Sequence, residues 1–387
     1  MERVELMRVS GSIQTRTTFA APVEFGLRTG ETVVLRPEDD TGPGRLLALL
    51  ESATSSQART VTGTIQILSS IDDADTLLPI SSVPTFFADV EPISPAIGKA
   101  YYATVEPIVD PATKAPVQPR ALEIGRLLTN SDVPVVANAC GFNRHTALLA
   151  QSGAGKSYAL GVLLEELLAK TDLRIVVIDA NGDFALLGDL PAAAAVAVVD
   201  GRDPKRYRSA VKRLGQRRSR GAVFNLNPLE PVLWDGVVGE VLSFLWDRRD
   251  EQRATLIVID EAHNFAPATE TDSNVSRLLL RIAAEGRKYG LWLTVASQRP
   301  QKLHGNVISQ CDNLIVMRLT SQNDLDHVTA SFGAVDRGMM QLATGFRSGS
   351  AMVVGRIVRS PTLMRFRERI LKEAGGDIAL DWGSDPA

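Results

Sequence analysis

The 387-residue sequence has few of the residues that build disulfide frameworks and metal clusters. It contains two cysteines, Cys140 and Cys311, and four histidines that show no metal-ligand spacing. Two cysteines do not make a disulfide framework, so a reducing cytoplasm is the compartment that best fits this composition. The first residues, Met1 to Glu5, are charged from the start and lack the apolar core of a signal peptide.

Long hydrophobic runs and an excess of one charge are also missing. The most apolar stretch, Pro191 to Val199, is too short to span a bilayer and is bounded by Asp189 and Asp200, so we expect no membrane segment. The formal net charge is only −3, so any basic surface for nucleic acid must be local. With 44% apolar residues, the chain has ample material for a core, and its length allows two or three domains.

Residues 1 to about 110 differ in pattern from the rest. Short β-rich runs alternate with turn clusters there, which predicts a small β-barrel or sandwich. The expected strands are Thr32 to Leu35, Val61 to Leu68 and Tyr101 to Val105, and the one convincing helical pattern covers Arg45 to Glu51. From Ile71 to Asp110 seven carboxylates occur with one lysine, Lys99, which indicates a solvated acidic face or a docking surface for a basic partner.

A proline-rich connector, Pro107 to Pro119, marks a domain boundary by composition. Beyond it, fully apolar strand candidates alternate with helical segments, which predicts an α/β domain with a mostly parallel sheet and helices on both faces. The expected strands are Thr146–Leu149, Leu173–Asp179, Ala195–Val199, Ala222–Leu226, Thr255–Asp260, Leu291–Ser297, Asn313–Leu319 and Ser350–Val354. Ligands are expected at the carboxyl ends of these strands. We place the domain limits at residues 1–110, a linker at 111–130, the α/β domain at 131–356 and a tail at 357–387.

The stretch from Ala150 to Ser157 is a glycine-rich turn between an apolar strand and an amphipathic helix. Its glycines let backbone N–H groups turn inward, and the following helix points the positive end of its dipole to the same place, so the loop can wrap a polyphosphate. Lys156 is expected to reach the β- and γ-phosphates, and Ser157 to hold Mg²⁺ through its hydroxyl. The pattern GxxxxGK[ST] normally begins with glycine, so Ala150 is a small departure. The alternative is an ordinary glycine-rich turn that enters a helix.

Polar residues stand at the ends of three other predicted strands. Asp260 and Glu261 follow the apolar run Leu256 to Ile259, where Asp260 can hold the water shell of Mg²⁺ and Glu261 can polarise an attacking water. Gln298 follows a neighbouring strand, where it can hydrogen-bond a γ-phosphate or the lytic water and sense hydrolysis, unless it is only a surface residue. The predicted nucleotide-binding residues are Ser152, Gly153, Ala154, Gly155, Lys156, Ser157, Tyr158, Asp179 and Asp183.

Together these runs closely resemble the HerA branch of the HerA/FtsK superfamily of DNA-translocating ATPases. The resemblance is strong from about residue 130 to 355, and it rests on the glycine-rich loop and on four runs: Asp-Ala-Asn-Gly-Asp at 179–183, Val-Ile-Asp-Glu-Ala-His-Asn-Phe at 258–265, Glu-Gly-Arg-Lys-Tyr-Gly at 285–290 and Ser-Gln-Arg-Pro at 297–300. It implies a RecA-like P-loop ATPase domain behind an N-terminal β-barrel, with ATP and Mg²⁺ bound between the subunits of a homohexameric ring. HerA-like proteins often carry a helical insertion after the first of these runs, and the short interval at 184–222 suggests that it is trimmed here.

In such rings an arginine from the neighbouring subunit completes the stabilisation of the transition state. By resemblance the candidates are Arg287 and Arg144, with Arg318 as a weaker third. Arg287 also fits a helix C-terminal cation that precedes Gly290. The predicted catalytic set is therefore Lys156, Glu261, Gln298, Arg287 and Arg144.

The densest basic run extends from Arg202 to Arg220, with nine Lys or Arg and only Asp203 against them. It is either a solvated basic helix or subunit rim, or a surface that contacts the phosphates of double-stranded DNA inside a ring. Tyr207 is its one aromatic residue, so backbone tracking fits better than base stacking. A second basic segment, Arg365 to Lys372, lies in the tail, where the resemblance favours a brace on the neighbouring subunit.

The first hypothesis is thus an ATP-driven DNA translocase or helicase that works with a nuclease or other effector protein docked through the barrel. The resemblance allows either DNA-end processing or defence against phage. The second hypothesis is a ring scaffold whose nucleotide state assembles and regulates an effector with little DNA movement. A secretion ATPase of the same superfamily is the third, and the lack of a membrane segment weighs against it.

Overall fold

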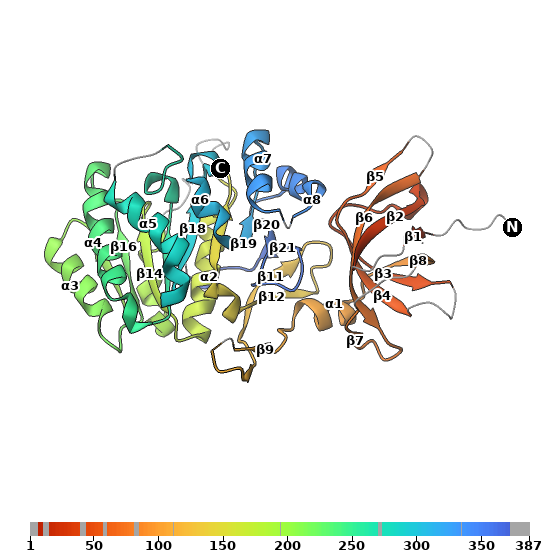
Figure 1. The fold of residues 1–387 in the computed structure, drawn as a ribbon, viewed down its shortest axis with the longest axis horizontal. Helices are drawn as coiled ribbons and strands as arrows, with labels where there is room; N and C mark the ends of the chain where they lie inside the picture. The colour runs from red at the N-terminus through yellow and green to blue at the C-terminus, as the bar shows by residue number, and fades with distance from the viewer. Residues whose placement is uncertain are drawn as a thin grey trace, which may run out of the picture.

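The computed structural model describes residues 7–10, 15–38, 44–56, 60–80, 85–110, 112–193, 195–269, 273–333 and 335–371. A β-barrel and a larger α/β domain follow one another along the longest axis of the molecule (Figure 1). Both parts agree with the fold class expected from the sequence, a small N-terminal barrel followed by a P-loop ATPase domain.

The barrel is an antiparallel sheet that closes on itself. Its strands follow the order β2-β1-β8-β3-β4-β6, and β6 pairs back with β2, so the six have no free edge. Their bounds are β1 Met7–Val9, β2 Arg16–Pro22, β3 Thr32–Pro37, β4 Arg45–Leu50, β6 Thr60–Ile71 and β8 Phe86–Pro92, and the short strands β5 Thr54–Ser55 and β7 Leu77–Leu78 pair with β6. Apolar side chains such as Phe19, Leu35 and Ile65 fill the interior.

Two local predictions in this region were wrong. Arg45 to Glu51, expected as a helix, contains strand β4, and Tyr101 to Val105, expected as a strand, begins with the last turn of helix α1 (Pro95–Tyr102). Helix α1 starts at Ser94, whose hydroxyl accepts the N–H of Ile97 at 3.2 Å, an ordinary N-cap.

Strand β4 is apolar at successive positions because both of its faces are covered. Leu46, Ala48 and Leu50 point into the barrel, whereas Leu47 and Leu49 pack with the cores of the α/β domain. A continuous apolar run of this kind does not distinguish a buried strand from a buried helix by its pattern. The pairing of β4 with β3 and β6 decides the matter.

The α/β domain is built on an eleven-stranded sheet in the order β12-β11-β21-β20-β19-β13-β18-β17-β14-β16-β15. The strands from β19 to β15 in this order are parallel, and the other four pair antiparallel at one edge. The bounds are β11 Ala121–Leu127, β12 Pro134–Asn138, β13 His145–Leu149, β14 Arg174–Asp179, β15 Val196–Asp200, β16 Gly221–Asn225, β17 Thr255–Ile259, β18 Leu291–Ser297, β19 Cys311–Val316, β20 Ser350–Val354 and β21 Thr362–Phe366, with the separate hairpin β9 Ile108–Val109 and β10 Pro116–Val117.

The antiparallel edge corrects three expectations. Ser350–Val354 is a strand as expected, but it runs antiparallel to β19. Strand β11 falls inside the predicted linker 111–130, and β21 falls inside the predicted tail 357–387, so both segments contribute strands to the sheet. Composition could not reveal this, because these strands meet partners that lie more than 200 residues away in the chain, as Gly125 and Phe366 do.

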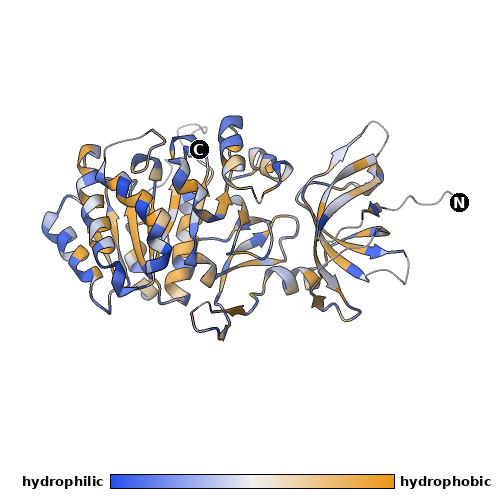
Figure 2. Cartoon of the chain, viewed as in Figure 1, coloured by the Kyte–Doolittle hydropathy of each residue, from blue (hydrophilic) through white to orange (hydrophobic). Residues whose placement is uncertain are grey.

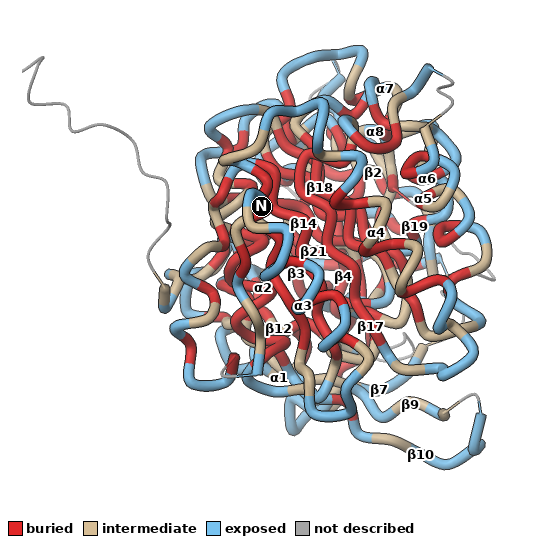
Figure 3. The backbone as a smooth tube through the Cα atoms, turned by 90° about the vertical axis from the view of Figure 1, so that its left-hand side faces the viewer, coloured by how far each residue is buried: buried red, intermediate tan, exposed pale blue. Residues whose placement is uncertain are grey.

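Helices cover both faces of the sheet, as expected. One core contains α2 together with Leu148, and the other contains α3, α4 and α5 together with Ala147 and Leu149. Figures 2 and 3 show the apolar, buried strands between these layers. The helices are α2 Lys156–Lys170, α3 Pro204–Leu214, α4 Trp234–Asp247, α5 Asn274–Glu285, α6 Gly305–Ser309, α7 Gln322–Ser331 and α8 Arg337–Gln341. Among the described residues, no helix has both the length and the apolar character to cross a membrane.

Candidate active site

The glycine-rich loop joins the carboxyl end of β13 to the first turn of α2. Gly153 and Gly155 have φ angles of +71° and +91°, a conformation that other residues rarely adopt, and Gly155 is the residue at which α2 begins. The N–H of Gln151 donates to the carbonyl of Arg318 at 2.8 Å, and the Arg318 guanidinium donates to the carbonyl of Gly153 at 3.3 Å. Arg318 therefore supports the loop of its own chain, which argues against the third candidate for an arginine that acts on a neighbour.

Lys156 lies against the two acidic residues that follow β17. Its ammonium is within hydrogen-bond distance of Asp260 and lies 3.2 Å from Oε1 of Glu261. All three side chains are buried. Burial opposes the charge of Lys156, but the two carboxylates outweigh it and raise the pKa of the ammonium. Lys156 and Glu261, predicted as catalytic residues, and Asp260, predicted as a ligand of Mg²⁺, are thus in direct contact.

Glu261 also contacts the predicted sensor. Gln298 Nε2 donates to Glu261 Oε1 at 2.5 Å, because β18 and β17 are parallel neighbours and both end at this edge of the sheet. Glu261 has a φ of +47°, a left-handed conformation that is uncommon for residues other than glycine. His263 Nδ1 lies 3.4 Å from Glu261 Oε2 and 3.0 Å from the Ser297 hydroxyl. Burial lowers the pKa of His263, with Glu261 opposing this effect.

Asp179 and Asp183 have a different place. The carboxylate of Asp179 accepts the backbone N–H groups of Gly182, Asp183 and Phe184 at 2.8 to 3.1 Å, and it is fully buried. Burial, partly offset by the N–H of Phe184, raises the pKa of Asp179 to about 6. This acid shapes the loop after β14, and the loop in turn presents Asn181, whose Nδ2 donates to Asp260 Oδ2 at 3.2 Å. Direct nucleotide contact by Asp179 and Asp183 stays a prediction.

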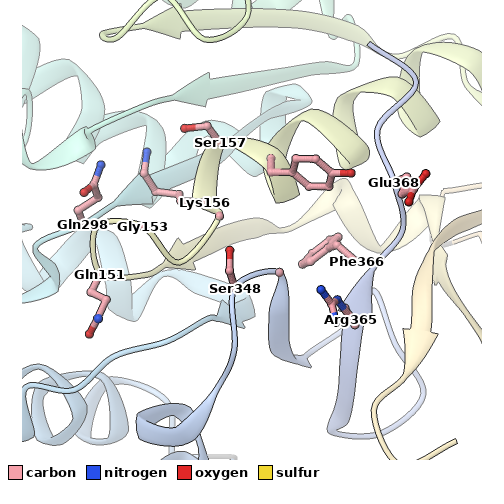
Figure 4. Close-up of a pocket in the computed structure, with 12 residues that line it drawn as sticks. Gln151, Gly153, Lys156, Ser157, Gln298, Ser348, Arg365, Phe366 and Glu368 are labelled. Carbon is pink, nitrogen blue, oxygen red and sulfur yellow. The ribbon is translucent and has the colours of Figure 1, made fainter. Parts of the chain in front are cut away.

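A cavity of about 660 Å³ opens over the loop (Figure 4). Lys156, Ser157 and Gln298 line one side of it, and segments from the antiparallel edge line the other. The complete lining is Gln151, Gly153, Gly155, Lys156, Ser157, Tyr158, Gln298, Ser348, Gly349, Arg365, Phe366 and Glu368. Of the other predicted contacts, Ala154 is buried beneath the loop and Ser152 is exposed on it.

The residues from the antiparallel edge were missed as site residues. Arg365 was predicted to lie in a tail that braces a neighbouring subunit, yet it belongs to β21 and lines the cavity of its own chain. The next residues also bind their own chain, since the N–H of Arg369 donates to the Tyr158 hydroxyl at 2.8 Å. The part of the predicted brace at residues 372–387 lies outside the described residues. Asn181 was also missed, although it stands in a run that the sequence had singled out.

The two arginines predicted to act on a neighbour lie at the opposite edge of the sheet. Arg144 directly precedes β13, and Arg287 lies in the turn before β18, so both are at amino ends of strands whose carboxyl ends hold the loop and Gln298. Strand β13 has five residues, so its first and last Cα atoms are about 13 Å apart at ~3.3 Å per residue. Neither arginine is placed to serve the loop that follows β13 in the same chain.

The basic run divides into bound and free cations. Arg202, Arg206 and Arg208 pair with Asp200, Asp203 and Glu240, and Arg220 donates to the carbonyls of Leu168 and Thr171. Arg220 is therefore a structural residue. The exposed cations of the run that have no acidic partner among the described residues are Lys205, Lys212, Arg213, Arg217 and Arg218.

Comparison with known proteins agrees with this geometry. Residues 122–298 match the family model for the central domain of the helicase HerA. Residues 122–298 are therefore similar to the HerA central domain. The chain is 37% identical over 110 residues to the DNA double-strand break repair helicase HerA of Pyrococcus furiosus, over 28% of the chain and 20% of the relative. It is 24% identical over 359 residues to a probable helicase of Methanocaldococcus jannaschii, over 67% of the chain and 69% of the relative.

The chain spans about a third of another relative, HerA of Sulfurisphaera tokodaii, at 29% identity over 167 residues and 41% of the chain. Among solved structures, VirB4 of Thermoanaerobacter pseudethanolicus aligns with a TM-score of 0.49 and 14% identity, over 64% of this chain and 96% of VirB4. The genome packaging NTPase B204 of Sulfolobus turreted icosahedral virus 2 aligns with a TM-score of 0.43 and 13% identity, over 58% and 98% of the two chains.

Proposed function

We propose that this chain is an Mg²⁺-dependent ATPase that moves double-stranded DNA through a homohexameric ring. The observation that carries the proposal is the direct contact of Lys156, Asp260, Glu261 and Gln298 beside the glycine-rich loop. Asp260 and Glu261 follow β17, Gln298 follows the neighbouring parallel strand β18, and Lys156 begins the helix that follows β13, which pairs with β18 on its other side. Such a set holds, neutralises and hydrolyses a triphosphate in P-loop ATPases.

The residues at the loop fit Mg²⁺ and ATP. The left-handed glycines leave the loop backbone open to a phosphate, and α2 begins at this point with Lys156 and Ser157. Ser157 and Asp260 would hold Mg²⁺, which supplies positive charge to the phosphate oxygens. Within the described residues no group of three or more His, Cys, Asp or Glu side chains forms a separate metal site. The metal would thus be completed by nucleotide oxygens and water.

The contacts of Lys156 indicate how the site would change when it is used. Lys156 exchanges Asp260 and Glu261 for phosphate oxygens, which leaves the Glu261 carboxylate free to orient and deprotonate a water. Gln298 keeps its hydrogen bond to Glu261 through this exchange and holds the base in place. Gln298 begins the segment after β18. The position of this segment therefore also depends on whether Glu261 contacts Lys156 or a water.

The proposed ring follows from the place of Arg144 and Arg287. Both lie at the edge of the sheet opposite to their own loop, so they can complete only a site in another copy of the chain. The exposed cations without acidic partners on and after α3, such as Arg213 and Arg217, are proposed to contact DNA phosphates, where six copies would provide a positive lining.

An effector protein is proposed to dock on the barrel, in DNA-end processing or in phage defence. The acidic segment gives limited support, since three of its seven carboxylates pair with arginines of the same chain. These pairs are Arg45 with Asp75, Arg36 with Glu91 and Arg359 with Glu106. A solvated acidic face therefore accounts for part of the pattern. We also propose a cytoplasmic location, which the free thiols of Cys140 and Cys311 support.

The catalytic assignment is tested with Glu261→Gln and Lys156→Ala. Each is expected to lower the ATPase rate by at least about 100-fold while the ring stays assembled. The exposed acid Glu251, which pairs with Arg248, provides Glu251→Gln as a matched control with the rate unchanged. Rates are measured by phosphate release, and assembly by light scattering after gel filtration. Retained hydrolysis in both variants would refute the site.

The same assay separates a motor from a regulatory scaffold. A motor is expected to bind duplex DNA in a salt-sensitive way and to hydrolyse ATP faster when DNA is added. Turnover that ignores DNA but responds to an effector protein would favour the scaffold instead.

A further inference from the structure

Arg144 and Arg287 share one carboxylate. Arg144 Nε lies 3.1 Å from Oδ2 of Asp312, and Arg287 Nη1 lies 3.5 Å from the same oxygen. The three side chains come from the turn before β13, the turn before β18 and the second residue of β19, which are far apart in sequence. Each is partly exposed, with side-chain exposures of 26%, 42% and 41% for Arg144, Arg287 and Asp312.

A rigid framework surrounds this group. The buried side chain of Asn313 donates to the carbonyl of Gly141 at 3.0 Å and to the Thr146 hydroxyl at 3.1 Å, and its Oδ1 accepts the N–H of Arg356 at 2.7 Å. Gly355 has a φ of +110°, and a Cβ there would come within 2.3 Å of the carbonyl of Asp312. The segments that carry Arg144, Asp312 and Arg356 are therefore fixed to one another.

The charges of this group do not balance. Arg356 adds a third guanidinium near Arg144, and burial together with the charges of Arg287 and Arg356 lowers the pKa of Arg144. A partly exposed ion pair contributes only about 0 to 1 kcal/mol to stability, and like charges held close together reduce that gain. Stability alone does not explain two arginines on one carboxylate with the charge of a third arginine acting on Arg144. An excess of guanidinium groups in a fixed place is what an anion requires.

The anion has to come from outside the chain. The group lies at the amino ends of β13, β18 and β19, whereas the glycine-rich loop lies at the carboxyl end of β13. In a closed ring of identical subunits, the edge of the sheet that lies away from its own glycine-rich loop can contact the glycine-rich loop of the adjacent subunit. The triphosphate bound there is the anion that two or three guanidinium groups fit.

We infer that Asp312 is a positioning residue that holds Arg144 and Arg287 as one pair of donors for the phosphates bound in the adjacent copy. The inference rests on the proposed function. The two arginines then act together and are not alternatives, because a shared acceptor brings both guanidinium groups within reach of one phosphate group. Asp312 contacts neither the nucleotide nor the attacking water in this proposal and acts only through the two arginines.

The test compares Asp312→Asn with Asp312→Glu in the assembled ring. The asparagine keeps the size but loses the charge, so kcat is expected to fall about 10-fold while KM for ATP, which the glycine-rich loop of the other subunit sets, stays the same. The glutamate restores a carboxylate and is expected to recover part of the rate. Asp326→Asn removes the acid from another exposed pair, with Arg337 at 3.0 Å, and is the matched control with kcat unchanged.

Coupling between the residues gives a second measure. If Asp312 works only through the arginines, adding Asp312→Asn to a chain that already carries Arg144→Ala and Arg287→Ala will not slow it further. If Asp312→Asn lowers kcat of this double variant by the same factor as it lowers kcat of the unaltered chain, the inference is overturned. So would a ring that falls apart on Asp312→Asn and also on Asp312→Glu, because Asp312 would then be an assembly contact.

Mixed rings test whether the group acts across subunits. Glu261→Gln subunits have an inactive site but intact arginines, whereas Asp312→Asn subunits have an intact Glu261. Rings assembled from both are expected to hydrolyse ATP faster than the average of the two pure rings. A rate equal to that average would show that Asp312 acts on the ATP site of its own subunit. If Glu261→Gln keeps full activity, the proposed function fails; if only Asp312→Asn does, the present inference alone fails.

Discussion

At the scale of single residues, His145 shows how the buried core restricts protonation. Its side chain is fully buried, and its Nδ1 accepts the N–H of Leu293 at 2.8 Å. Burial, together with the nearby charge of Arg287, lowers the pKa of His145 to about 4. The imidazole is therefore neutral in the folded chain across the neutral range, and the unfolded chain binds a proton there first.

This predicts an acid-sensitive contribution to stability. The pKa of His145 is near 6.5 in the unfolded chain and about 4 in the folded chain, so at pH values between them only the unfolded chain is protonated there. The free energy of unfolding therefore falls as the pH is lowered from 6.5 to 4, by about 3 kcal/mol in total. His145→Asn, which keeps an acceptor for Leu293, is expected to flatten the dependence of unfolding free energy on pH between 6.5 and 4. Denaturant titrations at several pH values measure it, and an unchanged slope would contradict the assignment.

Single residues are also where the sequence predicted most of the site. Lys156, Asp260, Glu261 and Gln298 were found because each stands at the end of an apolar strand or at the start of a helix, and strand ends in a parallel sheet converge. Asp312 was not found, since an acid at the amino end of a strand has no pattern of its own. Its proposed role depends on Arg144 and Arg287, which only the fold brings next to it.

At the scale of elements, the segment after β21 is fastened to the helix that follows the glycine-rich loop. Glu165 on α2 is fully buried, and its carboxylate accepts the N–H groups of Ile370 and Leu371 at 3.0 to 3.1 Å. Arg367 Nη1 lies 3.2 Å from Glu165 and Arg367 Nη2 lies 3.1 Å from Glu166. These contacts hold one wall of the nucleotide cavity against the helix that carries Lys156.

Glu165→Ala is therefore expected to be strongly destabilising. It removes the acceptor of the Ile370 and Leu371 N–H groups and one of the two carboxylates that pair with Arg367. Removal of one member of a buried charged pair costs about 3 kcal/mol. Glu251→Ala removes an acid from the exposed pair with Arg248 and is expected to cost less than about 1 kcal/mol. Denaturant unfolding of both variants at neutral pH measures the difference. Equal stabilities would show that the segment is not anchored as described.

Elements were predicted best where they are regular and parallel. Leu291–Ser297 was expected with the bounds that the structure shows, because a fully apolar strand between helices has a clear pattern. β4 was mistaken for a helix, and β11 and β21 were assigned to a linker and a tail. In each case the pairing with partner strands, and not a local preference, made the segment extended.

At the scale of the whole molecule, the proposed DNA contacts depend on charges that the fold leaves exposed. Arg213→Glu, Arg217→Glu and Arg218→Glu together are expected to weaken duplex binding and to reduce the slope of log affinity against log salt by about 2 to 3, at ~0.9 for each lost phosphate contact. Fluorescence anisotropy across a salt series measures the slope.

The matched control lies in the same run. Arg202, Arg206 and Arg208 already pair with acids, so their conversion to glutamate is expected to change the slope less. An identical slope for the first set and the unaltered chain would remove this surface from the DNA path.

The sequence by itself determined the class of fold, the resemblance to HerA and the residues proposed to meet a triphosphate. These depend on local patterns: a glycine-rich turn before a helix, and polar residues at the ends of apolar strands. Only the tertiary structure decided that Arg365 and Phe366 line the same cavity, that Arg318 supports its own loop, and that Arg144 and Arg287 gather on Asp312. Those arrangements join segments that are separated in the chain by between about 20 and more than 200 residues. Contacts between such segments arise from strand order and packing, which no local sequence pattern records.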